Sequence, residues 1–363
     1  MISYEERTKD YADKISAFKV KQKLPYEFKK RYAAVRVREF ISECDKRGLN
    51  YHVSVGGLDS ITLYLFIKSL GYSDVVGVSV SSLEDKSIQQ IHKEIGITSI
   101  KPYKNKADII REFGFPVLSK EIAAKIELLA NPSEKNKTVR HAIVTGETGE
   151  FGGFRKNTRM KLAQKWLDLF GGYENENENV NYQIPNFKVS SKCCYYLKEK
   201  PADDWAKEHN SVPFLGLMAS EGGRREKSLM INGCNYFGKS TIRSAPFAIF
   251  TRQDLLRLAL ELEVPLPEIY GKIYTDENGL LQTSGAQRTG CSMCGFGIHL
   301  EKRPHRFDML RQRNFKEWDF WMNHCCKDED GTEYGWGRVL DYIGIGWRDE
   351  VIDVNANQIT FYD

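Results

Sequence analysis

The fold is decided by the stretch Tyr51-His52-Val53-Ser54-Val55-Gly56-Gly57-Leu58-Asp59-Ser60. Its apolar first half predicts a short buried strand, the glycine pair predicts a turn, and the residues from Asp59 onward predict a helix. A second strand and helix are expected at 75–80 and 85–95, and a third strand at 98–101. Strands that alternate with helices at this spacing predict an α/β fold with a doubly wound parallel sheet, because each crossover helix must cover one face of the sheet.

The rest of the chain adds helical segments around this α/β pattern. We predict a helical lead-in at 1–48, a main domain at 49–310 and a helical C-terminal cap at 311–363. The main domain contains a helical and basic insertion at about 104–190, where the strand pattern is lost. The cap is expected to end in a short strand near 358–362.

Composition places the chain among ordinary globular proteins. Its 363 residues are 41% hydrophobic and 28% charged, and no apolar run approaches the roughly 18 residues of a membrane helix. The N-terminus is polar and acidic where a secretory signal would have a basic start followed by an apolar stretch. We therefore expect a cytoplasmic protein without a membrane partner, whose eight cysteines are reduced.

Positive charge is distributed unevenly along the chain. The formal net charge of +4 is too small to establish nucleic-acid binding, but basic residues gather between 120 and 165. The members of this cluster are Lys120, Lys125, Lys135, Lys137, Arg140, Arg155, Lys156, Arg159, Lys161 and Lys165. Such a cluster is usually a solvated surface, and the alternative is a footprint for nucleic acid or phosphate.

The glycine pair could bind phosphate. Between a strand and a helix start, backbone N–H groups can face an anion, and the helix dipole favours negative charge at the same point. Asp59 could hold a cation there, and the Ser60 hydroxyl could bond phosphate. From spacing alone, a Gly-Gly turn with Asp at the helix start is equally an ordinary feature of α/β proteins.

Three further basic residues are candidates for contact with phosphate. Arg224 and Arg225 follow the end of a predicted strand, where ligands of open α/β sheets collect. A guanidinium matches phosphate or sulfate with two parallel hydrogen bonds, although a surface ion pair is the alternative role. Lys120 is a weaker candidate of the same kind.

Two cysteine pairs, Cys193-Cys194 and Cys291-x-x-Cys294, could bind a metal. Thiolates are ligands for zinc and for iron–sulfur clusters. Cys193 and Cys194 are adjacent and point to different sides, which disfavours their binding one tetrahedral zinc ion. Any one of these cysteines could instead be a small core residue. The pair Cys325-Cys326 could be redox-active or supply a spare ligand, but a partly exposed helix end is the expected reading. Cys44 and Cys234, like His299 and His305, are expected to be structural.

The glycine loop and the cysteines resemble known motifs. The order Gly56-Gly57-x-Asp59-Ser60 after the first strand resembles the pyrophosphate loop of the adenine nucleotide alpha-hydrolase superfamily, which includes N-type ATP pyrophosphatases and sulfonucleotide reductases. The segment Lys192-Cys193-Cys194-x-x-Leu197-Lys198-x-x-Pro201, followed by Cys291-x-x-Cys294, resembles the [4Fe–4S] signature of the phosphoadenosine/adenosine phosphosulfate reductase family. Segments at 215–225, 244–255 and 264–270 are similar to further family motifs in the same order.

The likeness covers roughly residues 50–310, with two departures. Val55 stands where the family usually has the serine before the glycines, and Ser54 lies one position earlier. Met218 stands where an arginine is usual. The C-terminal Glu-Cys-Gly-x-His segment that carries the nucleophile of sulfonucleotide reductases is missing from this sequence.

The resemblance implies an adenine nucleotide alpha-hydrolase-like, Rossmann-like sheet with three kinds of cofactor: a [4Fe–4S] cluster, ATP or an adenylyl-sulfate nucleotide, and Mg²⁺. Implied catalytic residues are Asp59, Ser60, Arg224 and Arg225. Implied nucleotide contacts are Ser54, Gly56, Gly57, Asp59, Ser60 and Lys120. Implied cluster ligands are Cys193, Cys194, Cys291 and Cys294.

Three functions remain open at this point. The first is an enzyme that cleaves ATP between the α and β phosphates to activate a substrate, for sulfur transfer to a nucleic acid or a small molecule. The second is a thiol-dependent phosphoadenylyl- or adenylyl-sulfate reductase, which the missing nucleophile segment disfavours. The third is a non-catalytic nucleotide-binding protein with a structural cluster. Expected partners are an adenine nucleotide, a nucleic acid at the basic insertion 120–165, and a thiol reductant or sulfur donor.

Overall fold

The computed structural model describes residues 4–171 and 185–348, without the side chains of 4–9 and 223–225. The chain forms two compact units, and each is built from two separate segments. Unit 1 comprises Met1–Pro102 and Lys200–Cys291, and unit 2 comprises Tyr103–Glu199 and Ser292–Asp363. The predicted parts follow the order of the chain, whereas these units join segments that are far apart in sequence.

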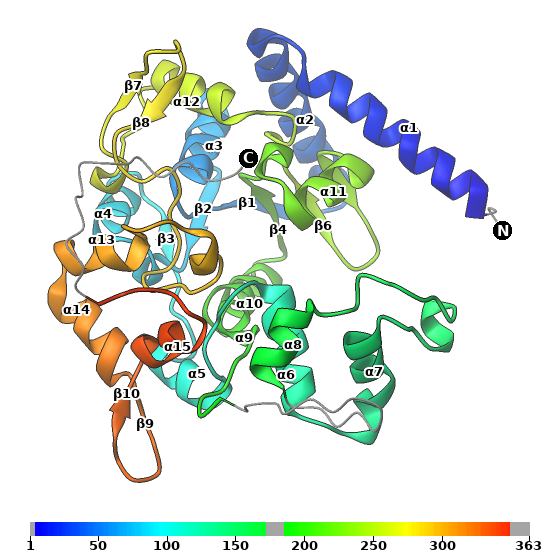
Figure 1. The fold of residues 1–363 in the computed structure, drawn as a ribbon. Coiled ribbons are helices and arrows are strands. Elements are labelled where there is room, and N and C mark those ends of the chain that lie inside the picture. The colour runs from blue at the N-terminus through cyan, green and yellow to red at the C-terminus, as the bar shows by residue number, and fades with distance from the viewer. Residues whose placement is uncertain (1–3, 172–184, 349–363) are drawn as a thin grey trace. The chain divides into compact units, whose positions relative to one another are not determined.

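Unit 1 contains a six-stranded sheet with the strand order β3-β2-β1-β4-β6-β5 (Figure 1). All neighbouring strands are parallel except the edge strand β5, which is antiparallel to β6. The strands are β1 (Asn50–Ser54), β2 (Val76–Ser79), β3 (Thr98–Ser99), β4 (Ser211–Leu215), β5 (Asn235–Phe237) and β6 (Ile242–Ser244). The predicted α/β class with a mostly parallel, Rossmann-like central sheet is therefore confirmed.

The strand order places a change of direction between β1 and β4. From β1 the chain passes through α3 (Leu58–Ser69) to β2 and through α4 (Lys86–Glu94) to β3, all on one side of β1. It then returns to β4 on the other side. Ligands of open α/β sheets bind beyond the carboxyl ends of the strands at such a switch point.

The sheet of unit 1 is held by an apolar core of strand and helix residues. Val53 of β1, Ile61 of α3 and Phe214 of β4 are fully buried in it. The predicted helical lead-in consists of α1 (Tyr4–Gln22) and α2 (Tyr26–Lys46), and the latter contributes Phe40. Unit 1 also contains α10 (Lys200–Glu208), α11 (Gly223–Asn232), α12 (Arg252–Glu261) and the hairpin of β7 (Ile273–Thr275) and β8 (Leu281–Thr283).

Unit 2 is mainly helical and has its own apolar core. Its α-helices are α5 (Lys106–Phe113), α6 (Lys120–Ala130), α7 (Lys137–Thr145), α8 (Gln164–Phe170), α9 (Lys192–Cys194), α13 (Arg306–Arg313), α14 (Phe315–Asp319) and α15 (Trp336–Tyr342). Phe115 from the first segment packs against Trp336 from the second, with ring centroids 5.0 Å apart. The C-terminal part also holds a hairpin of β9 (Cys326–Lys327) and β10 (Glu333–Tyr334), which the predicted helical cap did not include. The predicted strand near 358–362 lies outside the described residues.

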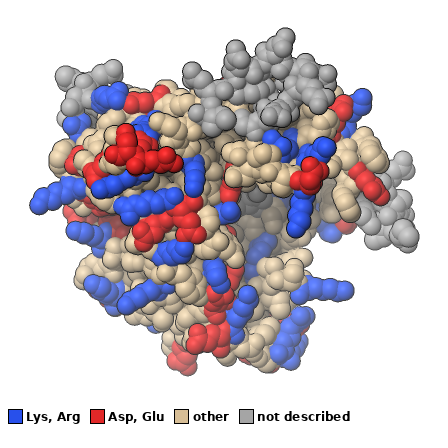
Figure 2. Space-filling model, turned by 90° about the horizontal axis from the view of Figure 1, so that it is seen from below, with Lys and Arg blue, Asp and Glu red and all other residues tan. Residues whose placement is uncertain are grey.

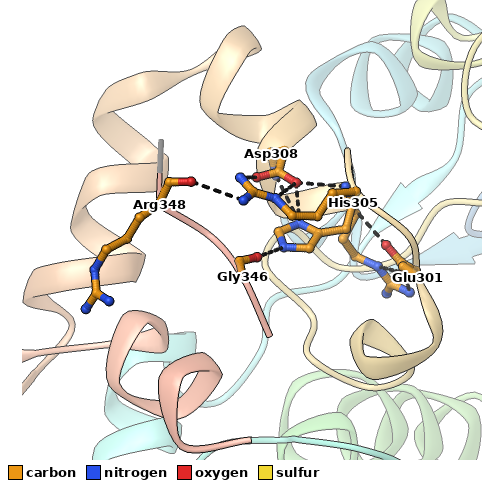
Figure 3. A network of polar contacts seen from close by, with 7 residues as sticks. Glu301, His305, Asp308, Gly346 and Arg348 are labelled. Carbon is orange, nitrogen blue, oxygen red and sulfur yellow. Dashed lines mark hydrogen bonds and ion pairs between the residues drawn. The ribbon is translucent and has the colours of Figure 1, made fainter. Parts of the chain in front are cut away.

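A buried polar network fixes the start of α13 in unit 2 (Figure 3). His305 is fully buried, and its Nε2 donates to the Gly346 carbonyl at 3.0 Å. Asp308 accepts from the His305 backbone N–H at 2.8 Å and from the Arg303 guanidinium at 3.0 Å. His305 is therefore a structural residue, as expected from the sequence.

Within the described ranges, no helix has the length and hydropathy needed to cross a membrane. Figure 2 shows Lys and Arg side chains interspersed with Asp and Glu over much of one face.

Candidate functional site

The predicted phosphate loop lies in unit 1 at the switch point between β1 and β4. Val55, Gly56 and Gly57 connect β1 to α3, and the Val55 side chain is buried in the core. A Cβ atom at Gly216, which directly follows β4, would lie 3.0 Å from the Ser60 backbone N. Because glycine has no Cβ atom, the loop after β4 can contact the first turn of α3. The carboxyl ends of β1 and β4 therefore meet at this point.

Ser60 closes the loop on itself. Its hydroxyl accepts a hydrogen bond from the Gly56 N–H at 2.7 Å and donates to the Gly57 carbonyl at 2.9 Å. This side chain thus fixes the glycine pair in one conformation. Ser54, the last residue of β1, is partly buried directly before the loop.

His92 of α4 holds the glycine loop through a hydrogen bond to the Gly56 carbonyl, a role that the sequence did not indicate. Its Nε2 lies 2.8 Å from the Gly56 carbonyl oxygen and its Nδ1 lies 2.9 Å from the Ser81 hydroxyl. A carbonyl oxygen can only accept, so Nε2 carries the proton and Nδ1 accepts from Ser81. The available signal was the position of His92 four residues after Ile88, on the buried face of α4.

Tyr270 contacts the amino end of α3. Its hydroxyl accepts from the Leu58 N–H at 3.0 Å and lies 2.7 Å from the Thr289 hydroxyl. Gly57 leaves space for these groups, because a Cβ atom there would collide with both hydroxyls. Burial raises the pKa of Tyr270 to about 12, so the phenol is neutral at physiological pH and can satisfy a helix N–H without charge.

Two carboxylates and one guanidinium lie at this end of the sheet. Asp59, in the first turn of α3, forms an ion pair of 2.8 Å with Arg252, and both side chains are about one quarter exposed. Arg252 is the first residue of α12 and also donates to the Gln287 carbonyl at 2.9 Å. Glu84 is buried, and its Oε1 would lie 3.7 Å from a Cβ atom at Gly56. The site therefore combines oxygen ligands suited to Mg²⁺ with a cation suited to phosphate.

The remaining predicted nucleotide residues lie elsewhere or outside the description. Arg224 and Arg225 are in the first turn of α11 in unit 1, but their side chains are not among those described. Met218 is buried in the core of unit 1, so it supplies no substitute for the arginine usual in the family. Lys120 belongs to unit 2, where it forms an ion pair with Glu199.

The first predicted cysteine pair is on α9 of unit 2. Cys193 is buried and Cys194 is partly exposed. The turn that follows is fixed by Tyr196, whose ring stacks on Phe113 of α5 at a centroid distance of 4.7 Å. Both thiols thus lie on a backbone with defined packing.

The second predicted pair, Cys291 and Cys294, is on an irregular loop, and both residues are partly exposed. In unit 2 this loop is anchored by Lys106, which donates to the Ser292 carbonyl, and by Arg306, which donates to the Cys294 carbonyl at 3.4 Å. Gly295 is required there, because a Cβ atom would overlap the Trp336 ring.

The four thiols have the donor chemistry that an iron–sulfur cluster needs. Across 4–171 and 185–348, no three or more His, Cys, Asp or Glu side chains are grouped as a metal site would require. The assignment of these cysteines as ligands stays a prediction.

The expected exposure of Cys325-Cys326 is wrong. Both residues are buried, and their sulfur atoms are 4.0 Å apart. Cys325 follows the helical turn that ends at His324, while Cys326 pairs with Tyr334 in the β9–β10 hairpin. The hydrogen bond to Cys326 and burial raise the pKa of the Cys325 thiol. The missed hairpin explains the error, because it covers the helix end.

No protein-family model and no curated protein matches the chain. The resemblance to the phosphosulfate reductase family therefore rests on the sequence motifs and stays a prediction. The geometry adds a glycine loop at the switch point of a parallel sheet, with Asp59 and Arg252 beside it.

Proposed function

We propose that this chain is a [4Fe–4S] adenine-nucleotide enzyme that cleaves ATP between the α and β phosphates to activate a substrate. Transfer of sulfur to a nucleic acid or a small molecule would follow this activation. The observation that supports the proposal most is the position of Gly56 and Gly57 beyond the carboxyl end of β1, with the ion pair of Asp59 and Arg252 beside them.

The loop residues suit binding of a pyrophosphate group. His92 holds the Gly56 carbonyl toward α4, and the N–H of the same peptide, on Gly57, then points the opposite way. That N–H and the dipole of α3 would face the phosphates. Arg224 and Arg225, at the start of α11, are further candidates for phosphate contact, and Lys120 is a weaker one.

The charged residues suit departure of pyrophosphate. Mg²⁺, when bound, would neutralise the phosphate oxygens and so stabilise the leaving group. Asp59 and Glu84 are the carboxylates near the loop that would hold it. Arg252 orients Asp59 and adds positive charge where the leaving group becomes more negative.

The four predicted cysteines would hold the cluster. Thiolates from Cys193, Cys194, Cys291 and Cys294 are the donors that [4Fe–4S] clusters use. The cluster would bind or deliver sulfur, and a thiol reductant or a sulfur donor would then be a partner. Cys325 and Cys326 are buried, so they do not favour the reductase alternative, which needs an accessible thiolate nucleophile.

One observation favours a second candidate, a nucleotide-binding protein without turnover. The Tyr270 hydroxyl already accepts the hydrogen bond of the Leu58 N–H, the first amide of α3. Nucleotide binding without release of pyrophosphate would support this candidate.

Release of pyrophosphate from Mg²⁺-ATP tests the proposal. Anaerobically purified protein is expected to form AMP or an adenylated product together with pyrophosphate, measured with a pyrophosphatase-coupled phosphate assay. Asp59→Asn removes the charge that would hold Mg²⁺ and is expected to lower the rate about 100-fold or more. Asp74→Asn changes an exposed aspartate of the same unit and should leave the rate unchanged. Release of ADP and phosphate, or equal rates for the two variants, would contradict the proposal.

A further inference from the structure

The segment 135–165 in unit 2 carries more net positive charge than the whole chain. It contains eight Lys or Arg and two Glu, giving a net charge of +6, whereas the complete sequence has +4. Apart from the half-buried Arg140, all these basic side chains are exposed. The basic residues are Lys135, Lys137, Arg140, Arg155, Lys156, Arg159, Lys161 and Lys165.

Some of these basic side chains have no acidic partner among the described residues. Lys156 lies 3.5 Å from Glu147, a contact that is highly exposed and weak. No acidic residue in 4–171 or 185–348 forms an ion pair with Lys135, Lys137, Arg159 or Lys161. These four side chains therefore offer positive charge to an anionic partner.

Two phenylalanines lie within this basic segment. Phe151 is fully exposed and Phe154 is 75% exposed, on the loop 146–158 that connects α7 toward α8. We call residues 146–158 the aromatic loop. In Figure 1 this loop extends away from α7 and α8. Full burial of such a side chain would contribute roughly 2 kcal/mol, so two exposed rings on one loop indicate a surface for a partner.

The aromatic loop is internally ordered rather than loosely extended. The Thr148 hydroxyl accepts from the Arg155 N–H at 3.0 Å and donates to the Gly152 carbonyl at 3.0 Å. The Phe154 N–H donates to the Gly149 carbonyl at 3.1 Å. Gly153 adopts a left-handed conformation with φ +68°, which turns the chain between the two rings. The rings are thus presented on a preformed turn, which lowers the entropy cost of binding.

We propose that the aromatic loop and the basic side chains around it form a binding surface for single-stranded nucleic acid. The Phe151 and Phe154 rings stack on unpaired bases, and Arg159 and Lys161, which directly follow the loop in the chain, contact phosphates. A lipid surface fits less well, because membrane-bound elements need a broader apolar face than two rings separated by glycines. The further step, that this strand is the acceptor of activated sulfur, rests on the proposed function.

Binding of a fluorescein-labelled oligothymidylate or oligouridylate, followed by anisotropy without ATP, tests this surface. Phe151→Ala/Phe154→Ala is expected to weaken binding about tenfold or more, because each ring loses its stacking with a base. Phe151→Trp/Phe154→Trp should retain the affinity, since the larger rings still stack. Arg159→Gln/Lys161→Gln should weaken binding and reduce its dependence on salt.

Phe315→Ala is the matched control, because Phe315 is an exposed phenylalanine of unit 2 outside the segment. Equal affinity of Phe151→Ala/Phe154→Ala and wild type, or no binding of either oligonucleotide, would overturn the proposal. Binding to phosphatidylserine vesicles in place of oligonucleotides would overturn it as well. If the protein releases no pyrophosphate but still binds the oligonucleotide in a way that depends on Phe151 and Phe154, the proposed function is wrong and the proposed binding surface is supported.

Discussion

At the scale of single residues, His92 determines which way the glycine loop at Gly56-Gly57 faces. The chain of hydrogen bonds from Ser81 through His92 to the Gly56 carbonyl is buried, and each bond is shorter than 3 Å. A carbonyl directed at a phosphate would repel it, whereas the same peptide reversed offers an N–H. The imidazole thus acts through the loop and is a positioning residue.

His92→Leu is expected to raise the dissociation constant of Mg²⁺-ATP about tenfold, because the Gly56 carbonyl and the Ser81 hydroxyl both lose their partner. Isothermal titration calorimetry measures this change. His92→Gln, which can still donate to Gly56, should recover most of the affinity, a rescue that loss of folding would not show. His141→Leu, at an exposed histidine, serves as the control. Unchanged affinity in His92→Leu would refute the positioning role.

The sequence indicated some residues of this site and not others for a physical reason. Gly56, Gly57 and Asp59 follow one another along the chain, so their local spacing predicted a loop at a helix start. Tyr270 and Arg252 reach the loop only through tertiary folding, over separations of 212 and 193 residues from Leu58 and Asp59. Local spacing carries no information on such contacts.

At the scale of elements, α2 and α12 are joined by a buried ion pair. Lys29 Nζ lies 2.8 Å from Asp254 Oδ2, and the two side chains are only 6% and 10% exposed. Asp254 also accepts from the Thr251 N–H at 2.7 Å, which completes a capping box at the start of α12. Asp254 therefore has two roles: it joins α12 to α2 through Lys29, and it takes part in the capping box of α12.

Lys29→Met is expected to lower the free energy of unfolding by about 3 kcal/mol, because it leaves the Asp254 charge buried without its cation. Lys29→Met/Asp254→Asn should recover part of this loss, since no charge then remains uncompensated. Urea unfolding followed by circular dichroism measures both.

Glu27 and Arg257 give a matched comparison, because they join the same two helices at 3.2 Å with both side chains more than half exposed. Glu27→Gln should cost about 0.5 kcal/mol or less. If Lys29→Met lowers the free energy of unfolding no more than Glu27→Gln does, the buried pair contributes no more to stability than the exposed pair.

Element boundaries were predicted well where local patterns decide them. Asp85 begins a helix as expected, and its side chain accepts the Ser87 N–H of the first turn. The β9–β10 hairpin was missed, although Asp330-Gly331 is a strong turn signal and Gly331 has φ +86°. Its strands are only two residues long, too short for alternation to be recognised.

At the scale of the whole molecule, the division into two units was beyond the reach of the sequence. The predicted insertion at 104–190 and the predicted cap at 311–363 are separated by more than 100 residues, yet both contribute to the core of unit 2. Trp336 illustrates this, because its ring packs against Phe115 at 5.0 Å and Phe307 at 5.4 Å. Periodicity shows that a residue is buried but not which residue covers it.

Metal content is the property of the whole chain that bears most directly on its chemistry. Anaerobically purified protein is expected to be brown and to contain about four iron and four sulfide per chain, the content of one [4Fe–4S] cluster. Cys194→Ala and Cys291→Ala should each lose most of the iron and the visible absorption, because each removes a thiolate ligand. Cys234→Ala is the matched control: Cys234 is buried in the core of unit 1, with its sulfur 4.0 Å from the Tyr32 hydroxyl. Its removal should lower stability modestly and leave the iron content unchanged. Colourless protein that contains zinc or no metal would contradict the cluster, and equal loss of iron in all three variants would show that folding rather than ligation controls it.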